Sequence, residues 1–236
     1  MEYLIVEEPR EENYNKFIKY VCNMSNIISF KVVTRKSNEK RLGKEFNKLC
    51  KLLNISKEEV IKNYNNPIFI EDTFNKLKGR KGIIKKWTNP LKGVEKKIGK
   101  SKEEVLSIKE KHIKMDIENI IFITVGKIIF EDKMKQIQEL LKEDFIKKET
   151  VLNHCKFVES YDVYYYKISN EVEKMLINQR RLYNMLFPDF PEDIRFFKDN
   201  NLWIETISHE EIGIINIDDE KEYNYLKSMG LDLKKM

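Results

Sequence analysis

Residues 161–236 constrain the fold most, because three short apolar runs there are separated by residues that favour turns. The runs are Ile194–Phe197, Leu202–Ile207 and Ile212–Ile217. They are separated by Lys198–Asn201 and Ser208–Glu211, and Asn and Asp tolerate the left-handed backbone of tight turns. The pattern predicts a three-stranded meander in this part of the chain.

A stretch with heptad-like spacing precedes the meander. Its members recur at alternating intervals of three and four residues, which predicts a long amphipathic helix that ends before Pro188. Such a stripe suits either packing on the protein's own sheet or the seam of a homodimer. The run Tyr164–Tyr166 also suits a strand and leaves the first turn ambiguous. The stripe consists of Tyr165, Ile168, Val172, Met175, Gln179, Leu182 and Leu186.

A further helix follows the meander. Asp219 and Glu222 have the spacing of a capping box, in which each side chain accepts a hydrogen bond from the other residue's backbone. Gly230 suits the left-handed position that ends a helix. We therefore expect a capped helix to close the fold.

The first 75 residues read as strands and helices in alternation. Three helices are expected here, the third opened by Ser56 as N-cap with Glu59 at the third helical position. Alternation of this kind suits α+β or α/β architectures. The expected elements are a strand at Glu2–Val6, a helix at Glu11–Asn23, a strand at Ile27–Thr34, a helix at Lys40–Leu53 and the helix after Ser56.

The middle of the chain adds two helices and three strands by the same criteria. Together with the two ends, these elements predict an α+β fold with a mixed sheet and several amphipathic helices. The expected elements are a helix at Ser101–Lys114, strands at Ile117–Val125 and Lys127–Phe130, a helix at Asp132–Lys148 and a strand at Thr150–Val158.

A basic segment runs from Lys76 to Lys102. It holds eleven basic residues and one acid, Glu95, so its net charge is +10 while that of the whole chain is +5. Four of the eight glycines also lie here, which suggests a flexible segment. The expected division is therefore 1–75, 76–102 and 103–236, with the first and last parts either separate or one continuous domain.

The basic segment is the main candidate for binding. Its lysines could follow a phosphate backbone while Trp87 stacks on a base, dock on an acidic protein surface, or stay in solvent. Because Arg80 is the only arginine between Lys76 and Lys102, any contact of this segment with nucleic acid would be largely non-specific. The candidate binding residues are Lys78, Arg80, Lys81, Lys85, Lys86, Trp87, Lys92, Lys96 and Lys97.

Several classes of site are not expected. With eight glycines and no glycine-rich loop after a strand, the chain offers no dinucleotide or P-loop site, and we expect no cofactor. Cys22, Cys50 and Cys155 are scattered, which argues against a disulfide framework or a zinc site and for buried free thiols. No run reaches the roughly 18 apolar residues of a membrane helix, and acids stand where a signal peptide has lysines. A cytoplasmic protein without membrane binding is expected.

Three residues are weak candidates for catalysis. His209 stands beside two carboxylates in a turn near Glu205, an arrangement that can tune a histidine for proton transfer. Asp193 could serve as the first acid of a magnesium-dependent nuclease, but Ile207 stands where the lysine of that motif belongs. The spacing that aims two histidines at one metal is missing, so no metal site is expected. His112 is expected on the surface and His154 on the opposite side of a strand from Cys155.

The segment from Phe187 to Glu210 resembles a module of small uncharacterised Firmicutes proteins. Its recurring parts are a Pro-Glu-Asp entry, an aromatic strand, a strand with Trp203 and a Ser-His-Glu turn. Together with the residues that follow this segment, the resemblance covers roughly the C-terminal 45 of the 236 residues. It implies a bacterial accessory protein of the immunity or defence-related kind, and no activity or site residue comes with it.

These observations favour a protein that acts by binding. The leading hypothesis is an inhibitor or immunity protein, bacterial or from phage, that occludes a protein partner through charged surfaces, since opposed charges steer association. The alternative is a nucleic-acid-binding protein that uses Lys76–Lys102. A third hypothesis is a hydrolase or nuclease around His209, Glu205 and Asp193.

Overall fold

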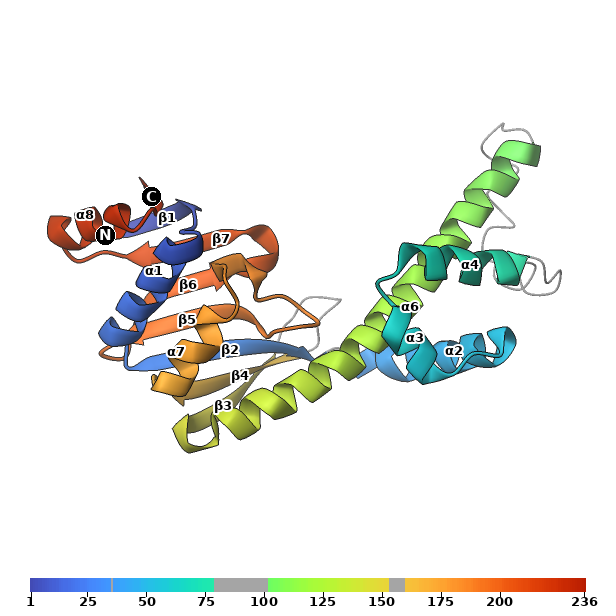
Figure 1. Ribbon diagram of the computed structural model, residues 1–236, viewed down its shortest axis with the longest axis horizontal. Helices are drawn as coiled ribbons and strands as arrows, with labels where there is room; N and C mark the ends of the chain where they lie inside the picture. The colour runs from blue at the N-terminus through green and yellow to red at the C-terminus, as the bar shows by residue number, and fades with distance from the viewer. Residues whose placement is uncertain (35, 79–101, 153–159) are drawn as a thin grey trace. The chain divides into compact units, whose positions relative to one another are not determined.

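The computed structural model describes residues 1–34, 36–78, 102–152 and 160–236. The chain forms two compact units, shown in Figure 1. Unit 1 comprises Met1–Arg35 and Ile129–Met236, and unit 2 comprises Lys36–Ile128. The division expected at residues 75 and 102 thus differs from the compact units. Unit 2 is an insertion into the sequence of unit 1, and composition alone does not mark its boundaries.

Unit 1 contains an eight-stranded sheet in the order β3-β4-β2-β5-β6-β7-β1-β8. Every pairing between neighbours is antiparallel, rather than mixed as expected. The α+β class is confirmed. The strands are β1 (Glu2–Glu7), β2 (Ile27–Thr34), β3 (Phe145–Leu152), β4 (Ser160–Lys167), β5 (Glu192–Lys198), β6 (Asn201–Ile207), β7 (Ile212–Asn216) and β8 (Asp232–Lys235).

Strand β2 pairs the N-terminal part of the chain with strands from its C-terminal part. It pairs with β4 along its whole length, from Ile27 opposite Lys167 to Thr34 opposite Ser160. Its other edge pairs with β5, where Ile28 lies opposite Phe196. The side chains of Ile28 and Phe30 are fully buried, so the apolar alternation of β2 fixes its register.

Helices of unit 1 pack on one face of the sheet. Figure 1 shows α1 (Glu11–Met24) and α7 (Asn170–Ile177) side by side on this face. The Tyr14 hydroxyl of α1 donates to the Leu176 carbonyl of α7 at 2.7 Å. The face expected for α1 is confirmed, because Tyr14, Phe17, Ile18 and Val21 are all buried.

The meander and the helix after it are confirmed. Strands β5, β6 and β7 follow one another in sequence and in the sheet. The helix α8 (Glu220–Ser228) begins with Asp219 as N-cap, whose carboxylate accepts from the Glu222 backbone N–H at 2.8 Å. Glu222 in turn accepts from the Asp218 backbone rather than from Asp219. Gly230 has a φ of +84°, and the chain continues into β8, which the sequence did not predict.

The long helix expected from Tyr165 to Leu186 is wrong, and with it the homodimer seam. Residues 160–167 form β4, and α7 and a single 3-10 turn, η3 (Leu182–Asn184), follow separately. The aromatic run favours a strand, and Ser169 caps α7 by accepting from the Val172 backbone N–H. The apolar side chains of α7 are buried against the sheet and α1, so none remains for a seam.

The strands expected at Ile117–Val125 and Lys127–Phe130 are also wrong. Both lie in α6 (Lys102–Leu140), a helix of 39 residues. Ile117, Ile121 and Val125 recur every four residues and are buried, so helical packing overrides the strand preference of β-branched residues. The helix expected to reach Lys148 ends at Leu140, and a 3-10 turn, η2 (Lys142–Asp144), leads into β3.

Unit 2 is helical throughout its described part. Its helices are α2 (Lys36–Leu53), α3 (Lys57–Asn63), α4 (Pro67–Lys78) and the first part of α6. The Ser56 cap of α3 is confirmed, since its hydroxyl accepts from the Glu59 backbone N–H at 3.0 Å. Buried residues include Phe46, Leu49, Val60, Phe74 and Leu77. Among all the described helices, none combines the length and apolar content needed to cross a membrane.

Glu8 ties the first strand to the segment after α7. Its carboxylate is almost completely buried and accepts from the backbone N–H groups of Leu182 (2.6 Å) and Tyr183 (3.1 Å). Arg181 donates to the other oxygen at 2.5 Å. One side chain therefore satisfies two backbone donors that are 174 and 175 residues away in the sequence.

We predict that Glu8→Ala lowers the free energy of unfolding by about 2–4 kcal/mol, because it leaves buried backbone donors without an acceptor. Equilibrium unfolding in urea measures this change. The neighbouring Glu7→Ala is the control, since Glu7 is exposed and its loss should change stability by less than about 0.5 kcal/mol. Equal effects of the two substitutions would contradict the prediction.

Candidate functional site

A β-bulge on β5 positions Asp193. Ser29 lies opposite Arg195 and Lys31 opposite Glu192, so β5 has one more residue than β2 between these pairs. Asp193 has a φ of +52°, a left-handed conformation that Asp tolerates better than most residues. Bulges of this kind redirect side chains and are common next to active sites.

Thr206 stabilises the bulge from the neighbouring strand. Its hydroxyl accepts a hydrogen bond from the Ile194 N–H at 3.0 Å and contacts the Ile194 carbonyl at 3.4 Å. Thr206 is fully buried on β6. The strained backbone is therefore held by a specific side chain, which makes the orientation of Asp193 a fixed feature of the sheet.

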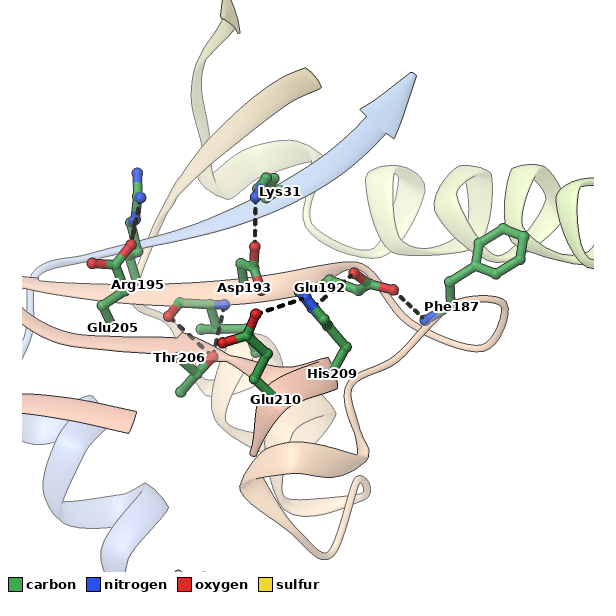
Figure 2. A network of polar contacts seen from close by, with 10 residues as sticks. Lys31, Phe187, Glu192, Asp193, Arg195, Glu205, Thr206, His209 and Glu210 are labelled. Atoms are coloured by element: carbon green, nitrogen blue, oxygen red, sulfur yellow. Dashed lines mark hydrogen bonds and ion pairs between the residues drawn. The ribbon is translucent and has the colours of Figure 1, made fainter. Parts of the chain in front are cut away.

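Asp193 is a buried carboxylate with one charged partner. Its side chain is only 7% exposed, and Lys31 on β2 donates to Oδ2 at 2.6 Å, as Figure 2 shows. The second oxygen, Oδ1, is buried and has no hydrogen-bond partner within the described parts of the chain. A buried carboxylate oxygen without a partner is costly, so this atom calls for an explanation.

His209 and Glu192 lie beside Asp193. The short 3-10 turn η4 (Ser208–Glu210) carries His209, whose Nδ1 is 3.8 Å from Glu192 Oε2 and whose Nε2 is 3.7 Å from Glu210 Oε1. The other oxygen of Glu192 accepts from the Phe187 N–H at 3.3 Å, which orients this carboxylate. One ligand atom each from Glu192, Asp193 and His209 lie within 4.8 Å of one another.

The structure brings together two of the three catalytic candidates. Asp193 and His209 belong to the cluster, whereas Glu205 forms an ion pair with Arg195, whose Nε lies 2.6 Å from its carboxylate. Sequence reasoning missed Lys31 and Glu192. Glu192 precedes Asp193 in the Pro-Glu-Asp entry, but Lys31 lies on a strand more than 160 residues away and no local signal could assign it.

Most candidate binding residues of the basic segment lie outside the described residues. Lys78 ends α4, and the other eight, from Arg80 to Lys97, lie outside the described residues. The exposed histidine His112 lies on α6, as expected for a surface residue. His154 and Cys155 lie outside the described residues. Cys22 and Cys50 are buried free thiols, and burial raises the pKa of Cys22 to about 12.

The sheet offers a second candidate site at its β3 edge, which we define as residues Phe145–Leu152. All eight residues of this terminal strand are exposed. Exposed apolar side chains stand at both ends of the strand, with Ile146 39% and Val151 36% exposed. Proteins usually keep edge strands short or charged, because a long exposed edge can pair with another chain.

The inner side of the β3 edge is firmly attached to β4. Lys148 pairs with Asp162 at 2.8 Å, and Thr150 donates to the same carboxylate at 2.7 Å. Glu149 accepts from Lys147 and from Tyr165, and these hydrogen bonds lower its pKa below the ordinary value. Most charges of the strand are therefore neutralised within the protein, and the backbone of its outer side remains at the sheet's end.

A shallow cavity of about 250 Å³ adjoins the β3 edge. Phe145, Tyr164 and Tyr166 form its apolar part, while Gln138 and Lys142 from the end of α6 and the following turn close it. Phe145 and Tyr166 are in edge-to-face contact, with ring centroids 5.8 Å apart. The cavity is large enough for one side chain of a bound chain, in the mode by which strand addition gains specificity.

Comparison with models of protein families gave no match, and neither did comparison with curated proteins or with solved structures. The resemblance of residues 187–210 to a Firmicutes module stays a prediction.

We predict that Lys31→Met lowers the free energy of unfolding by about 1–3 kcal/mol, because it leaves the Asp193 carboxylate buried without a counter-ion. The double variant Lys31→Met with Asp193→Asn should recover part of this loss, since the amide carries no charge. A double-mutant cycle in urea measures both effects.

The control for this cycle is Lys174→Met. Lys174 forms an exposed ion pair with Glu171, and removing it should cost less than about 0.5 kcal/mol. If Lys31→Met were as mild as the control, the Lys31–Asp193 pair would not stabilise the bulge.

Proposed function

We propose that the protein is a non-enzymatic binding protein of the inhibitor or immunity type. It holds an extended segment of a protein partner along the β3 edge and thereby occludes that segment. The observation that supports this most is that all eight residues of a terminal strand are exposed. An extended partner segment adds a strand to such an edge, and backbone hydrogen bonds supply affinity.

The side chains around the β3 edge favour a protein partner over a nucleic acid. Lys147 and Lys148 are already paired with Glu149 and Asp162, so few free positive charges remain for phosphates. Ile146 and Val151 offer apolar contacts instead. The cavity beside Phe145 suits a large apolar side chain of the partner segment.

A second copy of the chain is the alternative occupant of the β3 edge. Two copies that pair antiparallel about a two-fold axis place one residue opposite itself. The registers that pair most of the strand centre on Lys148 or on Glu149. Each register sets one pair of like charges opposite each other, and the Lys148 register also sets Lys147 opposite Glu149 of the other copy. We propose a different protein chain as the occupant, and a crosslinked product that is a second copy of this chain would contradict that choice.

Site-specific photocrosslinking tests this proposal. A photoreactive phenylalanine derivative replaces Val151, and in a matched control it replaces Val6 on β1, which is 49% exposed. In cells that naturally make the protein, we expect one crosslinked partner at position 151 and none at position 6. Identical products at both positions, or no product at 151, would contradict the proposal.

The partner, once purified, allows a quantitative test. We predict 1:1 binding that Ile146→Glu and Val151→Glu each weaken at least about tenfold, which corresponds to roughly 1.4 kcal/mol. Both side chains are exposed, so the fold should persist and circular dichroism can verify this. Val6→Glu and His209→Ala should leave the affinity unchanged. Loss of binding in Val6→Glu as well would indicate a general effect of charge.

A second candidate function is nucleic-acid binding by unit 2, favoured by how the charge divides. Unit 2 holds 23 basic and 12 acidic residues, a net charge of +11, whereas unit 1 holds 21 basic and 27 acidic residues, a net charge of −6. A basic unit of this kind attracts phosphate backbones. The division also suits an acidic protein partner.

Fluorescence anisotropy with random single- and double-stranded DNA and RNA tests this second function. Binding should weaken steeply between about 50 and 200 mM salt. It should also fall when Lys85 and Lys86 are both replaced by Glu. The matched control replaces Lys234 and Lys235, an exposed lysine pair at β8 in unit 1. Binding that neither salt nor the Lys85–Lys86 change affects would exclude this function.

A further inference from the structure

We propose that Glu192, Asp193 and His209 bind a divalent transition-metal cation. This inference is independent of the proposed binding function at the β3 edge. It rests on three observations: the mutual distances of the ligand atoms, the unpartnered oxygen of Asp193, and the environment of both His209 nitrogens. Figure 2 shows these groups converging from β5 and from the turn after β6.

The distances suit one shared ion. Oxygen and nitrogen ligands of a tetrahedral Zn²⁺ lie about 2.0–2.2 Å from the metal, so two ligands of one ion are roughly 3.4 Å apart. Glu192 Oε2 and His209 Nδ1 are 3.8 Å apart, and the three groups lie within 4.8 Å of one another. His209 is 54% exposed, so its ring can move the roughly 1 Å by which the longest separation exceeds tetrahedral geometry.

Asp193 supplies an observation that points to a missing partner. Its side chain is more than nine-tenths buried, and Lys31 occupies only Oδ2. Oδ1 is buried and accepts no hydrogen bond from any described residue. A cation bound to Oδ1 would satisfy this oxygen, and the carboxylate would then bridge Lys31 and the metal. The positive φ of Asp193 and the Thr206 contacts keep it in place without a ligand.

The second nitrogen of His209 has the environment of a metal ligand. With Nδ1 turned to Glu192, Nε2 lies 3.7 Å from Glu210 Oε1. Histidines that bind metals commonly donate their other N–H to a carboxylate, which fixes the tautomer and makes the ligand more basic. Both His209 contacts are longer than a hydrogen bond, so both carboxylates lie near the ring and both ring nitrogens can still accept a closer ligand.

The ligand types select the class of metal. An imidazole with two carboxylates suits Zn²⁺ or Mn²⁺, whereas Mg²⁺ and Ca²⁺ prefer oxygen ligands only. Lys31 lowers the affinity for the metal ion, because its ammonium group contacts the Asp193 carboxylate and repels a second cation there. Three protein ligands also leave coordination positions for water or for a ligand from solution.

Isothermal titration with ZnCl₂, using the full-length protein, tests the inference. We expect one Zn²⁺ per chain. His209→Ala and Asp193→Asn should each weaken binding at least about tenfold, consistent with the loss of a direct ligand. His112→Ala is the matched control, because His112 is an exposed histidine on α6 outside the cluster. Mg²⁺ in tenfold excess should not displace Zn²⁺.

Lys31→Met gives a prediction of opposite sign. Removing the ammonium group leaves Asp193 fully available, so Zn²⁺ should bind this variant more tightly than the wild type. Zn²⁺ should also raise the melting temperature of the Lys31→Met variant more than that of the wild type. The melting temperature of the His209→Ala variant should not change when Zn²⁺ is added. If the Lys31–Asp193 pair only stabilised the fold, Lys31→Met would not increase the affinity for Zn²⁺ or the melting-temperature shift that Zn²⁺ causes.

Three results would overturn the inference. The first is the absence of Zn²⁺ binding at millimolar concentration. The second is Zn²⁺ binding that His209→Ala and Asp193→Asn leave intact, which would locate the metal elsewhere. The third is equal weakening by His112→Ala. His209 and His112 are both exposed, so these substitutions should leave the fold intact, and circular dichroism verifies it for each variant.

Discussion

The pairing of β2 with β4 and β5 is the constraint on which the rest of unit 1 depends. Unit 2 is inserted after residue 35, so β2 must find partners that lie far away in the sequence. Closing a chain over such a separation costs conformational entropy, although the cost grows slowly with length. Burial of Ile28 and Phe30 in the core that they share with residues of α1 and α7 offsets this cost. Glu8 adds a second long-range tie between the two ends.

The same pairing produces the cluster around Asp193. The register of β2 against β5 accommodates one extra residue, and the bulge turns the Asp193 carboxylate towards Lys31. The meander then returns through β6, which brings His209 beside Glu192. A polar cluster is thus built at the point where the N-terminal and C-terminal segments of the sheet meet. Among the described strands, β3 pairs only with β4 and ends the sheet on this side, with all its residues exposed.

Much of the fold could be predicted where local signals agreed. The turns of the meander, the Ser56 and Asp219 caps and the apolar face of α1 all combine two independent cues, and all are confirmed. The errors arose where cues conflicted. Ile117, Ile121 and Val125 are β-branched but spaced for a helix, and tertiary packing decided for the helix. Tyr164–Tyr166 interrupts a heptad pattern, and there strand preference prevailed.

The candidate sites were harder to predict than the fold. Asp193 and His209 were singled out as residues, but Lys31 joins them only through strand pairing. Glu205 lies outside the cluster because strand pairing places it opposite Arg195, with which it forms an ion pair. The β3 edge was not predicted, because Phe145–Lys148 continues the amphipathic pattern of α6. A strand is an edge strand only by its place in the order of the whole sheet. Local sequence does not encode which strand lies last.

Hydrogen–deuterium exchange of the purified protein tests most directly whether β3 is a free edge on a sheet centred on β2. The account predicts that amides of β2 between Ile27 and Lys31, where it pairs with both β4 and β5, exchange only by global unfolding. Half of the β3 amides, those facing away from β4, should exchange orders of magnitude faster. Protection of β3 equal to that of β2 would mean that its outer side is already covered, and would contradict a free edge for a partner.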